Sequence, residues 1–298
     1  MHMFRTPLLL LSLVMACPAL AGTPINESRA LDPRGRVDIS NVKGRIQVRT
    51  WDRPEVKITG TLGAGVEKLE IDGGGEHLNV SVRYPNGGGW GERRSEPTDL
   101  QLVVPLRADL EIDSVSADVD VEGVAAGSLS IEAVSGQVLA IGAPRSADIS
   151  SVSGDVRLTL NSPEVDAQTV SGSLTLNGRL NGEVTVESVS GNVNVAVKDE
   201  RLREFKGNTV SGDLRISTGV APKAEFHMET VSGDVLLIVP KSLSAEVRGE
   251  TFSGDLRAPG VKVERGMGPG ASFQTRYGSG DGDISMETFS GNAELRFE

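Results

Sequence analysis

The chain has 298 residues, with 30 Lys and Arg against 41 Asp and Glu, and a formal net charge of −11. This acidic balance excludes a general nucleic-acid binder, which needs a basic footprint, and a polybasic membrane-surface protein. Glycine is abundant, at 36 residues, and aromatic residues make up only 4%. This composition favours many tight turns over a large aromatic-lined pocket.

Residues 1–21 have the pattern of a secretory signal peptide. Arg5 precedes an apolar run, and Ala19-Leu20-Ala21 supplies a cleavage site of small residues. The alternative is a lipoprotein signal in which Cys17 is lipidated. Cys17 is the only cysteine, so cleavage after Ala21 leaves no disulfide or thiolate site. We predict export to the periplasm or the cell surface, with no transmembrane segment after signal removal.

Residues 22–104 carry short alternating apolar patterns, such as Leu78 to Val82. We predict degenerate N-terminal β coils or a cap here, since solenoids need atypical ends. The Gly-rich stretch around Trp90, followed by Arg93 and Arg94, predicts a loop. Trp90 is a candidate for a ligand-binding tip, and a loop without a binding role is the alternative.

The rest of the chain is dominated by a repeat. Val-Ser-Gly or Phe-Ser-Gly occurs eight times, at steps of 18 to 21 residues except for a last step of 37. The eight glycines are Gly136, Gly154, Gly172, Gly191, Gly212, Gly233, Gly254 and Gly291. The long last step contains a Gly-rich insertion near 259–283.

Apolar residues alternate on both sides of each turn, as in Val193, Val195 and Val197 after Gly191. Alternation with period two predicts strands with one buried face. One such unit cannot bury its own apolar face, but stacked copies can. We therefore predict an all-β fold, with residues 105–298 as regular β-solenoid repeats. A sandwich or propeller of hairpins is the competing architecture.

The glycine of each repeat permits a positive φ or a sharp corner without a Cβ penalty. The next position carries Asp213, Asp234 and Asp255 in three copies. Their stacked carboxylates are calcium candidates, and turn chemistry in solvent is the alternative interpretation. Two residues further on, on the same strand face, the candidates for a binding surface are Arg157, Arg215 and Arg257.

A second acidic column lies four residues before the glycine. Its members are Glu132, Glu187, Glu229, Glu250 and Glu287. General acid–base catalysis needs two carboxylates in a cleft with separated pKa values. A repeated outward glutamate is instead typical of a solvated face that resists sheet aggregation.

The chain lacks the G-x-S-x-G, H-E-x-x-H and P-loop motifs. With its signal peptide and Val-Ser-Gly-Asp-Val/Leu units, it resembles the bacterial putative-adhesin family of exported β-strand-repeat proteins (DUF4097-like). The resemblance covers 110–298 best. It implies a stacked β fold outside the cytoplasm and a non-catalytic role, and it transfers no binding residues.

We therefore expect a non-enzymatic β-solenoid without cofactors, acting as an adhesin-like or cell-envelope scaffold protein. Its partner would be an envelope or surface protein or a glycan, and not a nucleic acid. One alternative is an envelope-stress sensor or partner-binding module. Another is a polysaccharide-active β-helix enzyme, in which the arginines would bind uronates.

Overall fold

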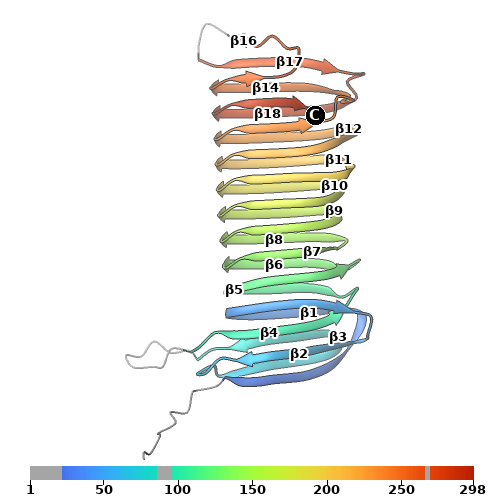
Figure 1. Ribbon diagram of the computed structural model, residues 1–298, viewed down its shortest axis with the longest axis vertical. Coiled ribbons are helices and arrows are strands. Elements are labelled where there is room, and N and C mark those ends of the chain that lie inside the picture. Colours follow the sequence, from blue (N-terminus) through green and yellow to red (C-terminus); the bar gives the residue numbers. More distant parts are fainter. Residues whose placement is uncertain (1–21, 86–94, 266–268) are drawn as a thin grey trace, which may run out of the picture.

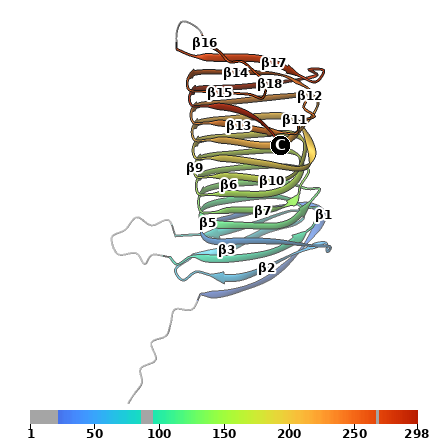
Figure 2. The same ribbon diagram turned by 45° about the horizontal axis from the view of Figure 1, so that its top comes forward.

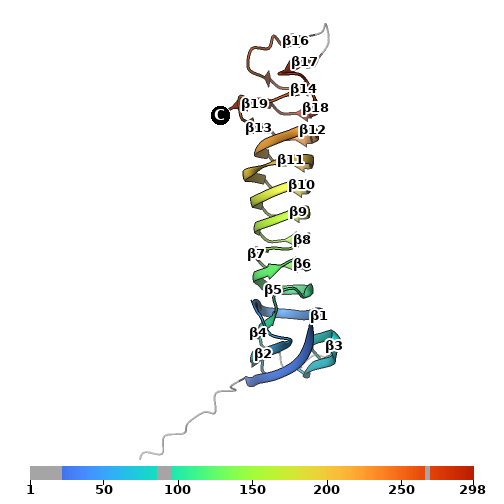
Figure 3. The same ribbon diagram turned by 90° about the vertical axis from the view of Figure 1, so that its right-hand side faces the viewer.

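The computed structural model describes residues 22–85, 95–265 and 269–298. These residues form nineteen strands, all hydrogen-bonded in one continuous sheet, and no helix. The strands stack as rungs of a rod (Figure 1), which is thin when seen from the side (Figure 3). The predicted all-β solenoid is confirmed. The described residues include no helix long and apolar enough to cross a membrane.

The N-terminal end of the rod combines parallel and antiparallel pairing. Its strands are β1 (Thr23–Trp51), β2 (Glu55–Leu62), β3 (Lys68–Arg83) and β4 (Thr98–Pro105). β2 pairs antiparallel with the start of β1 and with β4. The later part of β1 pairs in parallel with β3, β4 and β5. The antiparallel strands close this end of the rod, whose free edge could otherwise pair with another chain.

In the middle of the rod the chain stacks in sequence order. These strands are β5 (Asp109–Ala125), β6 (Ser128–Ser135), β7 (Val138–Ala143), β8 (Ser146–Ser153), β9 (Val156–Ser171), β10 (Leu174–Ser190), β11 (Val193–Ser211) and β12 (Leu214–Ser232). All pairings among them are parallel. The serine of each Ser-Gly turn lies opposite the serine of the next coil, as Ser190 lies opposite Ser211.

The core is a narrow layer between the strands before and after each turn. In β10, Leu174 and Leu176 after the turn and Val184 and Val186 before the next turn are at most 1% exposed. Each buried aliphatic side chain stabilises the fold by about 1.5–3 kcal/mol. Because a coil is too thin to cover these residues by itself, they are buried against the coils above and below.

The C-terminal end departs from sequence order. It comprises β13 (Val235–Val239), β14 (Ala245–Ser253), β15 (Leu256–Arg257), β16 (Glu264–Arg265), β17 (Ala271–Tyr277), β18 (Gly282–Ser290) and β19 (Ala293–Phe297). β18 pairs in parallel with both β12 and β14, and β19 pairs with both β13 and β15. The last coil of the chain is therefore inserted between two earlier coils. Figure 2 shows this end tilted towards the viewer.

The segment between the last two turns makes this insertion possible. β17 pairs antiparallel with β14, and β16 pairs antiparallel with β17. These strands cover the outer side of β14 while β18 returns to its inner side. The rod is thus closed by antiparallel strands at both ends.

Candidate binding surface

The repeated glycines form a column along one edge of the rod. Seven of the eight have positive φ, from 115° at Gly136 to 157° at Gly254. Stacking imposes a second requirement, because a Cβ on Gly212 would overlap the carbonyl oxygen of Gly191 in the preceding coil. Gly291 lacks a positive φ, yet a Cβ there would overlap the carbonyl oxygen of Gly233. The residue is glycine because two backbones approach closely at the turn.

The position after the glycine forms a ladder of side-chain-to-backbone hydrogen bonds. Asp213 Oδ1 accepts the backbone N–H of Asp234 at 3.0 Å, and Asp234 Oδ1 accepts that of Asn292 at 2.8 Å. Asn292 Oδ1 in turn accepts the backbone N–H of Asp255 at 2.9 Å. These oxygens satisfy turn N–H groups that would otherwise need water.

The three calcium candidates are therefore not consecutive in space, because Asn292 separates Asp234 from Asp255. The described residues contain no group of three or more His, Cys, Asp or Glu side chains arranged to hold a metal ion. Calcium binding by this column stays a prediction, and it would appear as a melting temperature that rises with millimolar calcium.

The three arginines of the predicted binding surface are not brought together either. Thr175 and Asn194 lie in the coils between Arg157 and Arg215. Leu236 and Glu294 lie in the coils between Arg215 and Arg257. Arg157 contacts Asp155 at 2.8 Å, whereas Asp255 is paired with Arg265. Trp90, the remaining candidate, lies outside the described residues.

The first residue of each Val-Ser-Gly or Phe-Ser-Gly triplet points out of the rod. These eight side chains are between 47% and 58% exposed. Together with two copies that precede the full repeats, they form a continuous apolar ladder: Val42, Val115, Val134, Val152, Val170, Val189, Val210, Val231, Phe289 and Phe252. At the ~4.8 Å spacing of strands, ten rungs extend over about 43 Å. The rings of Phe289 and Phe252 stack with their centroids 4.8 Å apart.

A column of small polar side chains lies directly inside this apolar ladder. Asn41, Ser114, Ser188 and Thr209 are at most 4% exposed. Thr209 Oγ1 donates to the carbonyl oxygen of Gly212 at 3.0 Å, and the Ser188 hydroxyl makes the equivalent bond to Gly191 at 3.2 Å. These bonds brace the turn from within, so that the residue before the serine faces solvent.

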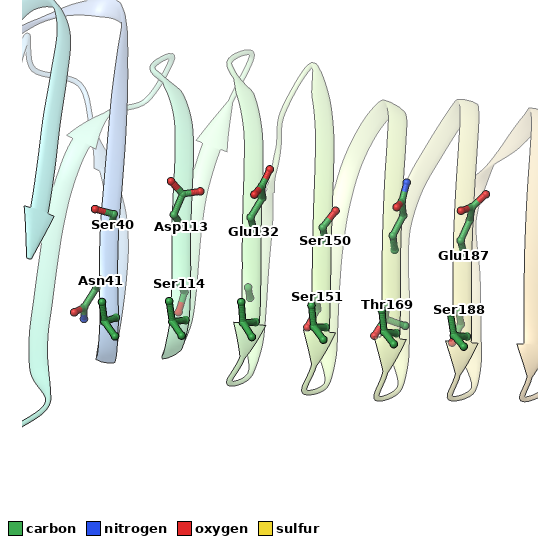
Figure 4. A pocket seen from close by; sticks show the side chains of 18 of the residues that line it. Ser40, Asn41, Asp113, Ser114, Glu132, Ser150, Ser151, Thr169, Glu187 and Ser188 are labelled. Carbon is green, nitrogen blue, oxygen red and sulfur yellow. The ribbon is translucent and has the colours of Figure 1, made fainter. Parts of the chain in front are cut away.

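A groove runs beside the apolar ladder. Its main part has a volume of about 940 Å³ and extends from Ser40 to Val231, and a second part of about 510 Å³ continues past Phe289 and Phe252. One wall is the apolar ladder and the other is the column four residues before each glycine. Figure 4 shows Asp113, Glu132 and Glu187 pointing outward in one row, with Ser150 between Glu132 and Glu187. Ser114, Ser151 and Ser188 form a second row nearer the turn.

The polar wall is acidic over most of its length. Its acidic side chains in the two parts of the groove are Asp113, Glu132, Glu187, Glu229, Glu250, Glu264 and Glu287. Insertion of the last coil places Glu287 between Glu229 and Glu250. Within the described ranges none of the seven forms an ion pair with Lys or Arg, and Glu229 lies 3.7 Å from His227. Arg83 is the one cationic side chain among the described lining residues, and it pairs with Glu70.

The surroundings of Asp113, the first acidic residue of this wall, shift the pKa of its carboxyl group. Partial burial raises the pKa of Asp113 above its usual value, and the nearby charges of Glu111, Glu132 and Asp38 raise it further. Arg36 acts in the opposite direction but does not cancel these effects. Burial and like-charge repulsion thus both favour the protonated form of Asp113.

Residues 94–227 match the family described as Toastrack DUF4097. This segment belongs to the Toastrack family. It includes six of the exposed valines, from Val115 to Val210. No curated protein matches the sequence.

The fold is also similar to solved structures of low sequence identity. A putative cell adhesion protein from Clostridium sporogenes ATCC 15579 has 10% identity and a TM-score of 0.25, with 93% of this chain and 100% of that chain covered. A putative adhesin from Bacteroides fragilis NCTC 9343 has 12% identity and a TM-score of 0.44, with 93% and 97% covered. A putative adhesin from Parabacteroides merdae ATCC 43184 has 10% identity and a TM-score of 0.35, with 92% and 96% covered. Values this low carry no conclusion about what this chain binds.

Sequence reasoning located the acidic column but missed the apolar ladder beside it. The signal was present in the alternation: Val184 and Val186 point inward, so Thr185, Glu187 and Val189 share the outward face. Valine is usually buried, so the sequence alone did not indicate that the repeat exposes the valine before each serine.

Proposed function

We propose that this Toastrack chain is an exported, non-enzymatic binding protein whose ligand surface is the groove between the apolar ladder and the acidic wall. The single observation that carries the proposal is the ladder itself. Ten apolar side chains, each 41–58% exposed, are aligned on one face. Scattered exposed apolar residues need no explanation, but a contiguous apolar patch marks an interaction surface.

The regularity of the groove supports binding rather than catalysis. A catalytic site needs a local constellation of different groups with matched pKa values. Here each coil presents nearly the same side chains as its neighbours, and the carboxylates lie in one row along one wall. We therefore propose an adhesin-like or envelope scaffold role at the periplasm or the cell surface.

The test is an array of envelope glycans, matrix proteins and peptidoglycan fragments, probed with purified residues 22–298. The double variant Val170→Ser with Val189→Ser removes apolar surface from the middle of the ladder without touching the core. Ile141→Ser with Leu106→Ser is the matched control, because these two apolar side chains are 41% and 37% exposed outside the groove.

We expect saturable binding that is lost in the groove variant and kept in the control. Equal binding by both variants would place the ligand elsewhere on the rod. Cleavage of a polysaccharide on the array would overturn the non-enzymatic assignment.

A further inference from the structure

The chemistry of the groove narrows the class of partner, an inference that rests on the proposed function. The groove offers a long apolar wall and an acidic wall side by side. An acidic polysaccharide, a nucleic acid or an anionic lipid would meet unneutralised carboxylates along most of its length. A partner that fits must supply apolar groups to one wall and positive charge to the other.

The charges of the wall are available to such a partner. Glu229, Glu287 and Glu250 occupy three successive rungs, at a spacing of about 4.8 Å. No Lys or Arg within the described ranges pairs with them. Like charges at this spacing repel one another, and a row of cations from a partner would remove that repulsion.

The backbone of the groove dictates the conformation of the partner. The strands that line it already pair with a coil on each side, as β10 pairs with β9 and β11. Their N–H and C=O groups are therefore used within the rod and cannot accept an added strand. A polypeptide lying in the groove therefore gains no backbone hydrogen bonds from these strands. This favours an α-helix, which satisfies its backbone polar groups within its own chain.

The dimensions agree with a helix lying along the rod. A helix rises 1.5 Å per residue, so about 28 residues would cover the ~43 Å ladder. The helical pitch of about 5.4 Å is close to the ~4.8 Å rung spacing. A helix of this length makes about eight turns along the ten rungs. An amphipathic helix can therefore place apolar side chains along the whole ladder and keep its basic residues over the acidic wall.

We infer that the groove is a docking site for a cationic amphipathic helix of a partner protein. A second copy of this chain fits less well, because it brings the same acidic wall and a net charge of −11. Charge complementarity favours a basic partner.

The inference is tested with a synthetic 28-residue peptide of Leu and Lys, with Leu at helical i, i+3, i+4 and i+7 positions. Two further peptides control for pattern and charge. One has the same composition with Leu and Lys alternating, and the other replaces Lys by Glu in the helical pattern. Binding to residues 22–298 is measured by titration calorimetry, and helix formation by circular dichroism.

We expect the helical Leu/Lys peptide to bind and to gain helicity, and both other peptides to bind at least about tenfold more weakly. Glu187→Gln with Glu229→Gln should weaken binding about tenfold, as should Val170→Ser with Val189→Ser. Asp213→Asn with Asp234→Asn removes the same two charges from the turn ladder, where an Asn oxygen still accepts the N–H, and should leave binding unchanged.

Equal weakening by the two charge variants would overturn the inference, because general attraction to an acidic protein would then explain the binding. A wild-type dimer that Val170→Ser with Val189→Ser converts to a monomer would also overturn it, since the occupant would be a second copy. If the array yields a groove-dependent ligand while the helical peptide does not discriminate, the helix fails and the proposed binding function stands.

Discussion

The middle and the C-terminal end of the rod are built from the same repeat but assembled differently. From β9 to β12 each coil stacks on the one before it. At the C-terminal end β18 lies between β12 and β14, although it follows both of them in the sequence. The hydrogen bonds at the turns are nevertheless alike: Gly212 N–H donates to Ser232 O at 3.0 Å, and Gly291 N–H donates to Ser253 O at 3.0 Å. Stacking thus depends on the register of the Ser-Gly turn and not on the order of the coils in the chain.

The surface of the groove also differs between the two regions. In the middle, Ser150, Gln168 and Asn208 interrupt the acidic wall. At the C-terminal end Glu229, Glu287 and Glu250 follow one another without interruption, and the two phenylalanines of the ladder stack on each other. The end of the groove is therefore the more acidic and the more aromatic part.

The sharpest test of the inserted order is disulfide trapping, because its outcome is nearly all or none. Val231→Cys with Phe289→Cys places the two cysteines on adjacent rungs. Their Cα atoms are then about 4.8 Å apart, which is within the range of a disulfide. Val231→Cys with Phe252→Cys places them two rungs apart, at about 9.6 Å, which is out of range. Oxidation of residues 22–298 followed by a mobility assay should show a cross-link in the first variant alone. A cross-link in the second would mean that the coils stack in sequence order.

The next largest effect is expected at the repeated glycines. Replacing one of them should destabilise the protein equally in both regions. Gly212→Val in the middle forces a side chain onto the carbonyl oxygen of Gly191, and Gly291→Val at the end does the same to Gly233. Each should lower the free energy of unfolding by at least about 2 kcal/mol. Urea titration measures the change.

Ser211→Ala serves as the control for the glycine variants, since Ser211 is exposed and adjoins the same turn. It should change the free energy of unfolding by less than about 0.5 kcal/mol. Wild-type stability of either glycine variant would refute the close approach of backbones at the turn.

A smaller effect should distinguish the two parts of the acidic wall. Glu287→Lys puts a cation between Glu229 and Glu250 and should stabilise the protein by up to about 1 kcal/mol at low salt. Gln168→Lys in the middle has Ser150 and Glu187 as its neighbours and should stabilise it less. Both gains should shrink in 1 M NaCl, where exposed charges are screened. Equal gains would mean that the wall is no more crowded at the end than in the middle.

The smallest expected effect is the pH dependence of Asp113 at the other end of the wall. Its pKa is raised in the folded protein, chiefly by burial, so the native state holds this proton more tightly than the unfolded chain does. The stabilising contribution is complete below the unfolded pKa and is lost as pH rises through the folded pKa. Asp113→Asn should therefore raise the melting temperature at pH 7 but not at pH 3. An equal shift at both pH values would show that the carboxyl is not responsible.

Much of this architecture could be predicted from local sequence. Glycines at near-constant spacing, flanked by alternating valines and leucines, indicated stacked β coils because stacked copies alone can bury such thin apolar faces. The outward acidic column followed from the same alternation. The alternation also predicts the apolar ladder, because Val186 points inward and Val189 points outward. A valine beside a turn nevertheless suggests burial, so the outward direction of Val189 was missed.

For the candidate aspartates and arginines near the turn, the sequence predicted which residues share a column. It did not predict which of them lie next to each other. The spacing put Asp213, Asp234 and Asp255 in one column, yet Asn292 lies between the last two. Likewise, Arg257 is two residues from Asp255, but Arg265 takes that carboxylate. Both outcomes depend on segments distant in sequence.

The sequence by itself determined the repeating unit: which residues face inward, where each turn falls, and why each turn needs a glycine. These are properties of one coil and its own backbone. Only the tertiary structure decided which coil lies on which. Parallel stacking of near-identical turns has nearly the same energy for any pair of coils, so the final order depends on long-range closure. The β16 and β17 strands cover β14 and leave its inner side free, and the last coil fills that place.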